Sequence, residues 1–158
     1  MSVVHVVSQS NVSYAQVQAV ARLLPDAIAE TFGNLPTNVL KAVNGITSAV
    51  TGVAPYAFFC VAEVDSQVVG FLGGVLDSDV FSDRKFARDI LAWVQPSARD
   101  TSAYRDMVTR FEHWAITQGA REVRGILLAD ETAERLAHAA ERYGYRRAGI
   151  VIVKQVSG

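Results

Sequence analysis

The chain has 158 residues, half of them hydrophobic, and a formal net charge of −1 at pH 7. This length and composition predict a single domain over residues 1–158 whose core needs neither a disulfide nor a metal. The near-neutral charge argues against general nucleic-acid binding, and the absence of any run of about 18 apolar residues argues against a membrane span.

The N-terminal third predicts a strand followed by two helices. Val3–Val7 is short and β-branched, which favours a strand. Ser13 and Gln16 have the spacing of a capping box, so a helix is expected to begin there, and Pro25 is expected to end or kink it. After a break, apolar residues recur at helical spacing over Val39–Val50, which predicts the second helix.

The middle of the chain predicts three antiparallel strands. Ala57–Val64 and Gln67–Leu76 read as partners joined by a tight turn at Asp65 and Ser66. After a polar loop, Ala87–Val94 reads as the next strand.

From Ser102 onward the apolar period changes to about 3.6, which predicts a helix that Gly119 ends. The rest predicts a strand, a helix ended by Gly144, and a final strand, at Glu122–Leu128, Thr132–Tyr143 and Ile150–Gln155. A strand, helix and strand over residues 87–128 imply one parallel pair within an otherwise antiparallel sheet.

Four segments, in their order and spacing, are similar to the motifs of one family. They are Phe58–Phe71, Val94-Gln95-Pro96, Phe111–Ala115 with Gly119-Ala120, and Arg142–Arg146. The pattern resembles the GNAT superfamily of acyltransferases over residues 57–155, with the small GNAT-like proteins of tailed phages as the most similar group. This resemblance implies an α/β (α+β) fold with about four helices and a mixed sheet of about six or seven strands, the fourth and fifth splayed apart.

The resemblance also implies a chemistry, which is transfer of an acetyl group from acetyl-CoA to an amine. The pantetheine arm would lie along Trp93, Val94 and Gln95 in the gap between the splayed strands. The pyrophosphate would lie at the start of the next helix, held by Arg99 and by the backbone of Thr101, Ser102 and Ala103. Exposed N–H groups and the positive end of a helix favour an anion at such a place.

The loop departs from the family pattern, because Asp100, Ser102 and Tyr104 stand where glycines are expected. Without the family, Asp100 or Ser102 reads as the N-cap of the helix. The family's usual proton donor, a tyrosine on the fourth helix, is replaced by Ala140.

Three residues remain as catalytic candidates. Asp89 and Glu63 are candidate general bases, although each also reads as a solvated strand residue. Tyr143 is the candidate acid, with core packing as the alternative. Cys60 lies in an apolar run and reads as a buried core residue.

Two functions therefore stay open. One is an acetyl-CoA-dependent N-acetyltransferase acting on a small-molecule or protein amine. The other is a non-catalytic GNAT-fold protein that binds a protein partner, for example as a structural or host-directed component of a phage. A weaker third idea is a module that binds another acyl or nucleotide ligand.

Charge and location add further expectations. Residues 1–83 carry a net charge of −5 and residues 84–158 a net charge of +4, which could suit an anionic ligand. The N-terminus lacks the features of a signal peptide and there is one cysteine, so a cytoplasmic location is expected, or host cytoplasm or virion for a phage protein. Neither a membrane nor nucleic acid is an expected partner. The apolar side of Val39–Val50 reads either as part of the core or as a surface that packs on a second copy in a homo-oligomer.

Overall fold

The computed structural model describes residues 2–127 and 132–156, which form two units, Met1–Gly125 and Ile126–Gly158. Among the described residues, no helix is both long and apolar enough to cross a membrane.

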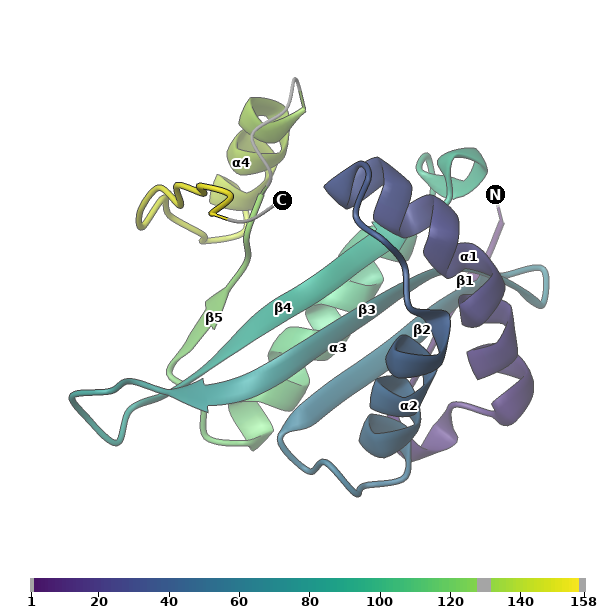
Figure 1. The fold of residues 1–158 in the computed structure, drawn as a ribbon, viewed down its shortest axis with the longest axis horizontal. Helices are drawn as coiled ribbons and strands as arrows, with labels where there is room; N and C mark the ends of the chain where they lie inside the picture. Colours follow the sequence, from purple (N-terminus) through teal and green to yellow (C-terminus); the bar gives the residue numbers. More distant parts are fainter. Residues whose placement is uncertain (1, 128–131, 157–158) are drawn as a thin grey trace. The chain divides into compact units, whose positions relative to one another are not determined.

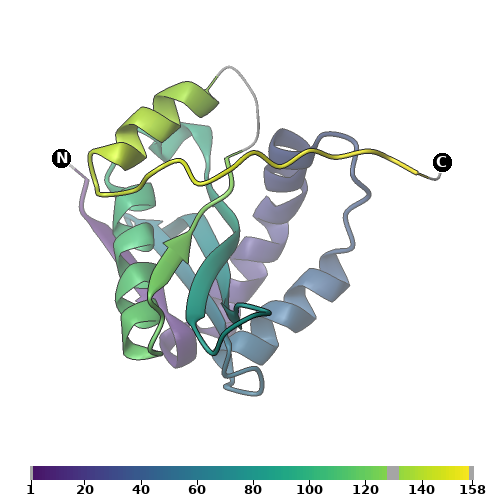
Figure 2. The same cartoon turned by 90° about the vertical axis from the view of Figure 1, so that its left-hand side faces the viewer.

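The first unit is a five-stranded mixed sheet with helices on both faces. The strands are β1 (Val4–Ser8), β2 (Ala57–Val64), β3 (Gln67–Ser78), β4 (Lys85–Val94) and β5 (Glu122–Arg124), in that spatial order. All neighbours are antiparallel except β4 and β5, which are parallel. Two helices, α1 (Tyr14–Phe32) and α2 (Val39–Val50), cover one face, and α3 (Ala103–Thr117) covers the other (Figures 1 and 2).

Alternation along the strands gives the sheet two apolar layers. Phe58 on β2 faces α3, where its ring lies 5.3 Å from the rings of both Phe111 and Trp114. Phe59, the next residue, faces the opposite side and packs with Phe71. Because successive side chains of a strand point to opposite faces, one apolar run serves both layers.

Several local predictions are confirmed. The second helix and the β2 strand have the predicted bounds. Asp65 and Ser66 form the β2–β3 turn with positive φ angles of 51° and 62°, as a two-residue hairpin turn of this twist requires. Ser13 and Gln16 form the capping box, each side chain accepting a hydrogen bond from the other residue's backbone N–H.

Pro25 does not end the first helix, because α1 continues through it to Phe32. Pro25 is exposed, whereas Leu24 and Ala27 beside it are buried. The carbonyl that loses its helical donor therefore lies on the outer side of the helix, and packing of the inner side holds the helix together.

Cys60 is fully buried on β2, and burial raises the pKa of its thiol to about 12. The thiolate is the reactive form of cysteine, so Cys60 is chemically inert in the folded protein. This placement agrees with its predicted role as a core residue.

The described part of the second unit, residues 126–127 and 132–156, contains the helix α4 (Ala133–Glu141), followed by Gly144 with a φ angle of 88°. Residues 150–155 were predicted to form a strand, and this is wrong because the structure assigns them no ladder. β-branched residues favour an extended backbone, but a strand also needs a pairing partner. The described sheet therefore has five strands rather than six or seven.

Candidate functional site

The ladder between β4 and β5 stops early. Only Phe86, Ala87 and Arg88 pair with β5, while β4 continues to Val94. Within residues 2–127, the edge of β4 from Asp89 to Val94 thus has no strand paired to it on the β5 side. The fifth strand was predicted to run to Leu128, but it ends at Arg124, and residues 125–127 have no strand assignment. Leu128 itself lies outside the described residues, so the separation of the fourth and fifth strands stays a prediction.

The backbone at the end of β4 offers hydrogen-bonding groups on this edge. The N–H of Gln95 donates to the carbonyl of Val69 at 2.8 Å, on the β3 side. Since alternate residues direct their backbone groups to opposite edges, those of Val94 and Ala92 point away from β3. Such an edge can bind an extended, amide-containing chain, as an added strand would bind.

A bulge marks the place where the β4 edge opens. Gly73 pairs with Leu91 and Gly74 pairs with Asp89, so Ile90 is an extra residue on β4. A bulge reorients the side chains around it and interrupts the regular ladder. Asp89 therefore lies at the boundary between the paired and the unpaired part of the β5 side.

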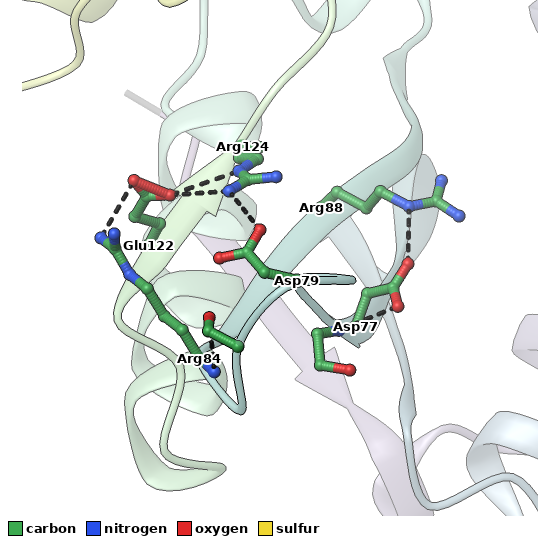
Figure 3. Close-up of polar contacts among 8 residues, drawn as sticks. Asp77, Asp79, Arg84, Arg88, Glu122 and Arg124 are labelled. Atoms are coloured by element: carbon green, nitrogen blue, oxygen red, sulfur yellow. Dashed lines mark hydrogen bonds and ion pairs between the residues drawn. The ribbon is translucent and has the colours of Figure 1, made fainter.

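An ion network holds the paired part (Figure 3). The guanidinium of Arg124 on β5 lies over the ring of Phe86, 3.6 Å from its centroid. Arg124 also binds Glu122 at 2.9 Å and Asp79 of the β3–β4 loop at 3.3 Å, and Arg84 binds Glu122 at 3.1 Å. These contacts tie β5 and the β3–β4 loop to the beginning of β4.

Asp89 is half-buried on the α3 face of the sheet, the face that Ala87 also occupies. A Cβ added at Gly125, directly after β5, would lie 3.7 Å from its Oδ2. The carboxylate of Asp89 is therefore directed toward the end of β5, where the β4–β5 ladder stops.

Tyr104 lies in the first turn of α3. Its pKa is raised by burial and, to a smaller extent, by the negative charge of Asp89. Met107 is buried and faces the sheet. Around the helix axis, Tyr104 lies about 60° from Met107, on the same side as Val108. Asp106 and Arg110 lie on the opposite side of Met107. Arg110 donates to Ser8 of β1, so the Tyr104 side of α3 is the β4 side. The phenol is therefore protonated at neutral pH and lies on the side of α3 toward Asp89.

The structure does not bring Glu63 to the same place. Glu63 lies on β2 and accepts a hydrogen bond from Gln16 Nε2 of α1 at 2.8 Å, on the face opposite to Asp89. Tyr143 follows α4 in the second unit, where its backbone N–H donates to Ala140 and its side chain is exposed. Its role as the acid stays a prediction.

Arg99 and Trp93 meet at a residue that the sequence analysis missed, Glu30 in the last turn of α1. Arg99 Nη2 lies 2.5 and 2.6 Å from the two carboxylate oxygens of Glu30, and Trp93 Nε1 donates to Glu30 at 2.9 Å. Arg99 Nε donates to the carbonyl of Val94 at 3.0 Å. The Glu30–Arg99 contact spans 69 residues of sequence, and no local pattern signals it.

An open pocket of about 390 Å³ lies beside this contact. Leu23, Asp26 and Glu30 of α1 line one side of it, and Trp93 and the segment Gln95–Ser97 line the other. The pocket is therefore on the α1 face of the sheet, at the same end of β4 as Arg99.

Polar groups of the loop before α3 form hydrogen bonds with one another and with the first turn of the helix. Ser102 is the N-cap residue, as predicted, but its hydroxyl makes no capping bond and instead donates to Asp106 at 2.5 Å. The capping role falls to Thr101, whose hydroxyl accepts from the N–H of Ala103 at 3.2 Å and donates to Ala98 at 2.6 Å. Asp100, the other predicted cap, is exposed.

The segment from β4 to α3 can be compared with what acetyl-CoA requires, namely an edge for the pantetheine arm, positive charge for the pyrophosphate and backbone that a phosphate can approach closely. It meets the first two requirements. The edge of β4 fits a pantetheine arm, and Arg99 stands before the positive end of α3, where a pyrophosphate is favoured. The third requirement, close approach of a phosphate to backbone, is less well met because the loop contains no glycine.

No family model matches the sequence, and the comparison with curated proteins finds no match. Solved structures with a similar fold do exist. An aminoglycoside acetyltransferase from an uncultured soil metagenomic sample superposes with a TM-score of 0.73 at 14% identity, covering 98% of this chain and 99% of that one. The chain has the GNAT fold.

Two further solved structures agree. Ribosomal-protein-alanine N-acetyltransferase from Brucella melitensis biovar Abortus gives a TM-score of 0.72 at 12% identity, covering 98% of this chain and all of that one. Aminoglycoside N-acetyltransferase AAC(6')-Iy, solved in complex with CoA, gives 0.71 at 16% identity, covering 98% and 95%. The GNAT fold thus accounts for nearly the whole chain.

Proposed function

We propose that this chain is an N-acetyltransferase that moves an acetyl group from acetyl-CoA to an amine. The observation that carries the proposal is the early end of the β4–β5 ladder beside the carboxylate of Asp89, beyond which β4 has no ladder on its β5 side within residues 2–127. The GNAT fold supports it, because the neighbours named above are acetyltransferases. Fold alone does not fix function, so the argument depends on the residues of the site.

Binding would use two parts of the segment from β4 to α3. The backbone of Ala92 and the N–H of Val94 would bond the pantetheine amides, with Trp93 and Gln95 beside them, while the Val94 carbonyl accepts from Arg99 Nε. Arg99 and the N-terminal backbone of α3, from Thr101 to Ala103, would hold the pyrophosphate. Acetyl-CoA would supply an activated thioester, and the chain would supply alignment with the amine, which by itself accelerates acyl transfer.

Asp89 would act as the general base. An amine must lose a proton before it can attack a carbonyl, and a carboxylate at the opening of the gap can accept that proton. Asp89 is preferred to Glu63 because Glu63 lies on the other face, hydrogen-bonded to Gln16.

The departing thiolate needs a proton from an acid. Tyr143 is the candidate that the sequence indicates. Tyr104 is a second candidate, because its phenol stays protonated at neutral pH and its side of α3 faces β4. The test between them is loss of turnover in Tyr143→Phe or in Tyr104→Phe.

A second function, protein binding without catalysis, is favoured by one observation. The groups that would hold a pyrophosphate are already bonded within the chain, Arg99 to Glu30 and Ser102 to Asp106. In this case the fold would serve as a scaffold for a protein partner, such as a component of a phage particle or of its host.

Thermal shift with acetyl-CoA separates the two functions. A ligand at 100 times its Kd stabilises a protein by about 2.7 kcal/mol, which raises Tm by about 5–10 °C for a chain of this size. We expect a saturable shift that Arg99→Ala abolishes. Arg121→Ala, which removes the same charge before β5, is the control and should keep the shift. No shift at millimolar acetyl-CoA would favour the second function.

Acceptors can be screened once binding is established. The names of two neighbours suggest an aminoglycoside and an alanine-containing peptide as first amines. Release of free CoA, followed with a thiol reagent, measures turnover directly.

A further inference from the structure

Arg99, the guanidinium that the proposed function assigns to the pyrophosphate, already holds a carboxylate of its own chain. Glu30 binds Arg99 Nη2 through both of its oxygens and also accepts the indole N–H of Trp93. Arg99 Nε is bonded to the carbonyl of Val94, so the guanidinium is fixed at the end of β4. Glu30 thus occupies Nη2 of Arg99, one of the donor groups that a phosphate oxygen would use.

We infer that Glu30 sets the affinity of this chain for CoA by competing with the pyrophosphate for Arg99. The inference rests on the proposed function, because CoA is the ligand that this function requires. A phosphate within hydrogen-bonding reach of Arg99 lies close to the Glu30 carboxylate, and two negative charges at that range repel each other. Binding therefore has to open the Glu30–Arg99 pair or to tolerate the repulsion.

The exposure of the pair makes its opening feasible. The side chains of Arg99 and Glu30 are 46% and 47% exposed. Ion pairs in contact with water are weak, so a multivalent anion can displace a single carboxylate. Glu30 then weakens phosphate-bearing ligands and leaves ligands without phosphates unaffected, which makes it a specificity-determining residue.

The test compares two ligands and two variants by isothermal titration calorimetry. CoA carries the pyrophosphate, and pantetheine has the same arm without any phosphate. Glu30→Gln keeps the size of the side chain and can still accept the hydrogen bond of Trp93, but it lacks the charge. Asp26→Asn is the matched control, because Asp26 lines the same pocket one helical turn earlier.

We expect Glu30→Gln to tighten CoA binding about tenfold and to change pantetheine binding by less than about twofold. Asp26→Asn should change both affinities by less than about twofold, because its charge does not contact Arg99 and is screened by salt. In an Arg99→Lys background, which keeps a positive charge but not the guanidinium that binds Glu30, Glu30→Gln should tighten CoA binding by less than in the wild type. A melting curve of each variant verifies folding, and Glu30→Ala serves as a second variant.

The outcomes separate the inference from the function. If the wild type binds CoA and Glu30→Gln binds it equally or more weakly, the inference is wrong and the proposed function stands. Equal gains for CoA and pantetheine also overturn the inference, since pantetheine has nothing to place on Arg99. If neither the wild type nor Glu30→Gln binds CoA, the proposed function itself fails.

Discussion

The two ends of β4 are built in opposite ways. Its beginning, residues 85–88, is paired on both sides and held by the ion network around Arg124. Its end, residues 89–94, is paired with β3 alone among the described residues, and its outer edge meets the Glu30–Arg99 pair. At the beginning of β4, ion pairs join the strand β5 to the β3–β4 loop. At its end, the Glu30–Arg99 ion pair lies beside an edge that β5 does not pair with.

The bulge at Ile90 separates these two ends. On one side of it, backbone groups at the outer edge of β4 are used by β5. On the other side, no strand within residues 2–127 pairs with those groups, and the Val94 carbonyl accepts from Arg99 Nε instead. The candidate site therefore begins where the β4–β5 pairing stops, and Asp89 lies at this boundary.

The largest expected effect comes from Asp89→Asn. Asparagine has nearly the same shape but cannot accept a proton from an amine, so kcat should fall about 10²–10⁴-fold while Tm changes little. The measurement is release of CoA with the amine found in the acceptor screen. Asp65→Asn, in the exposed β2–β3 turn, is the control and should keep the wild-type kcat.

This variant tests whether the boundary between the two ends is catalytic. If Asp89→Asn retains a kcat within about twofold of the wild type, a general base at the boundary is excluded, since loss of such a base costs at least about 10²-fold. A large loss in Glu63→Gln instead would move the base to the α1 face of the sheet.

A smaller effect, on stability, is expected from Gly74→Ala. Gly74 pairs with Asp89 at the bulge, and a Cβ there would overlap the ring of Phe111 and lie 3.1 Å from the carbonyl oxygen of Arg88. Overpacking of this kind costs about 1–3 kcal/mol, or a fall in Tm of about 2–10 °C for a chain of this size. Thermal unfolding followed by circular dichroism measures it.

The neighbouring glycine provides the matched control. A Cβ at Gly73 would meet its nearest atom, in the ring of Phe59, at 3.8 Å, which is ordinary contact. Gly73→Ala should therefore lower Tm much less than Gly74→Ala. Equal losses would mean that the cost comes from strand flexibility rather than from the close approach of α3 at the boundary.

Much of this architecture could be predicted from local sequence. The capping box at Ser13, the turn at Asp65 and the helical period over Val39–Val50 are signals within a few residues, and each is confirmed. The run from Val94 through α3 was also predicted, because Pro96 and the change of period mark its parts.

The misses share a physical cause, which is dependence on distant partners. Pro25 stays in a helix because the packing of its neighbours outweighs one lost hydrogen bond. The run Ile150–Gln155 has strand-forming residues but no described ladder. Glu30 is an ordinary exposed helix residue by pattern, and only folding brings it to Arg99 and Trp93.

The smallest effect is expected from Arg124→Met at the closed end of β4. Methionine keeps an unbranched side chain on the ring of Phe86 but removes the charge that binds Glu122 and Asp79. Because the pairs are exposed to water, Tm should hardly change. Hydrogen exchange should instead become faster at the amides of β5, since three backbone pairs alone hold a short strand weakly.

The control for this variant is Arg121→Met, which removes the same charge just before β5 and should leave exchange unchanged. If Arg124→Met also leaves the exchange of β5 unchanged, the ladder alone holds the strand and the ion network is a consequence of pairing. If exchange accelerates only in β5, the charges around Arg124 stabilise the β4–β5 ladder, and the end of that ladder marks the candidate site. The contrast between the two ends then rests on side chains rather than on backbone length.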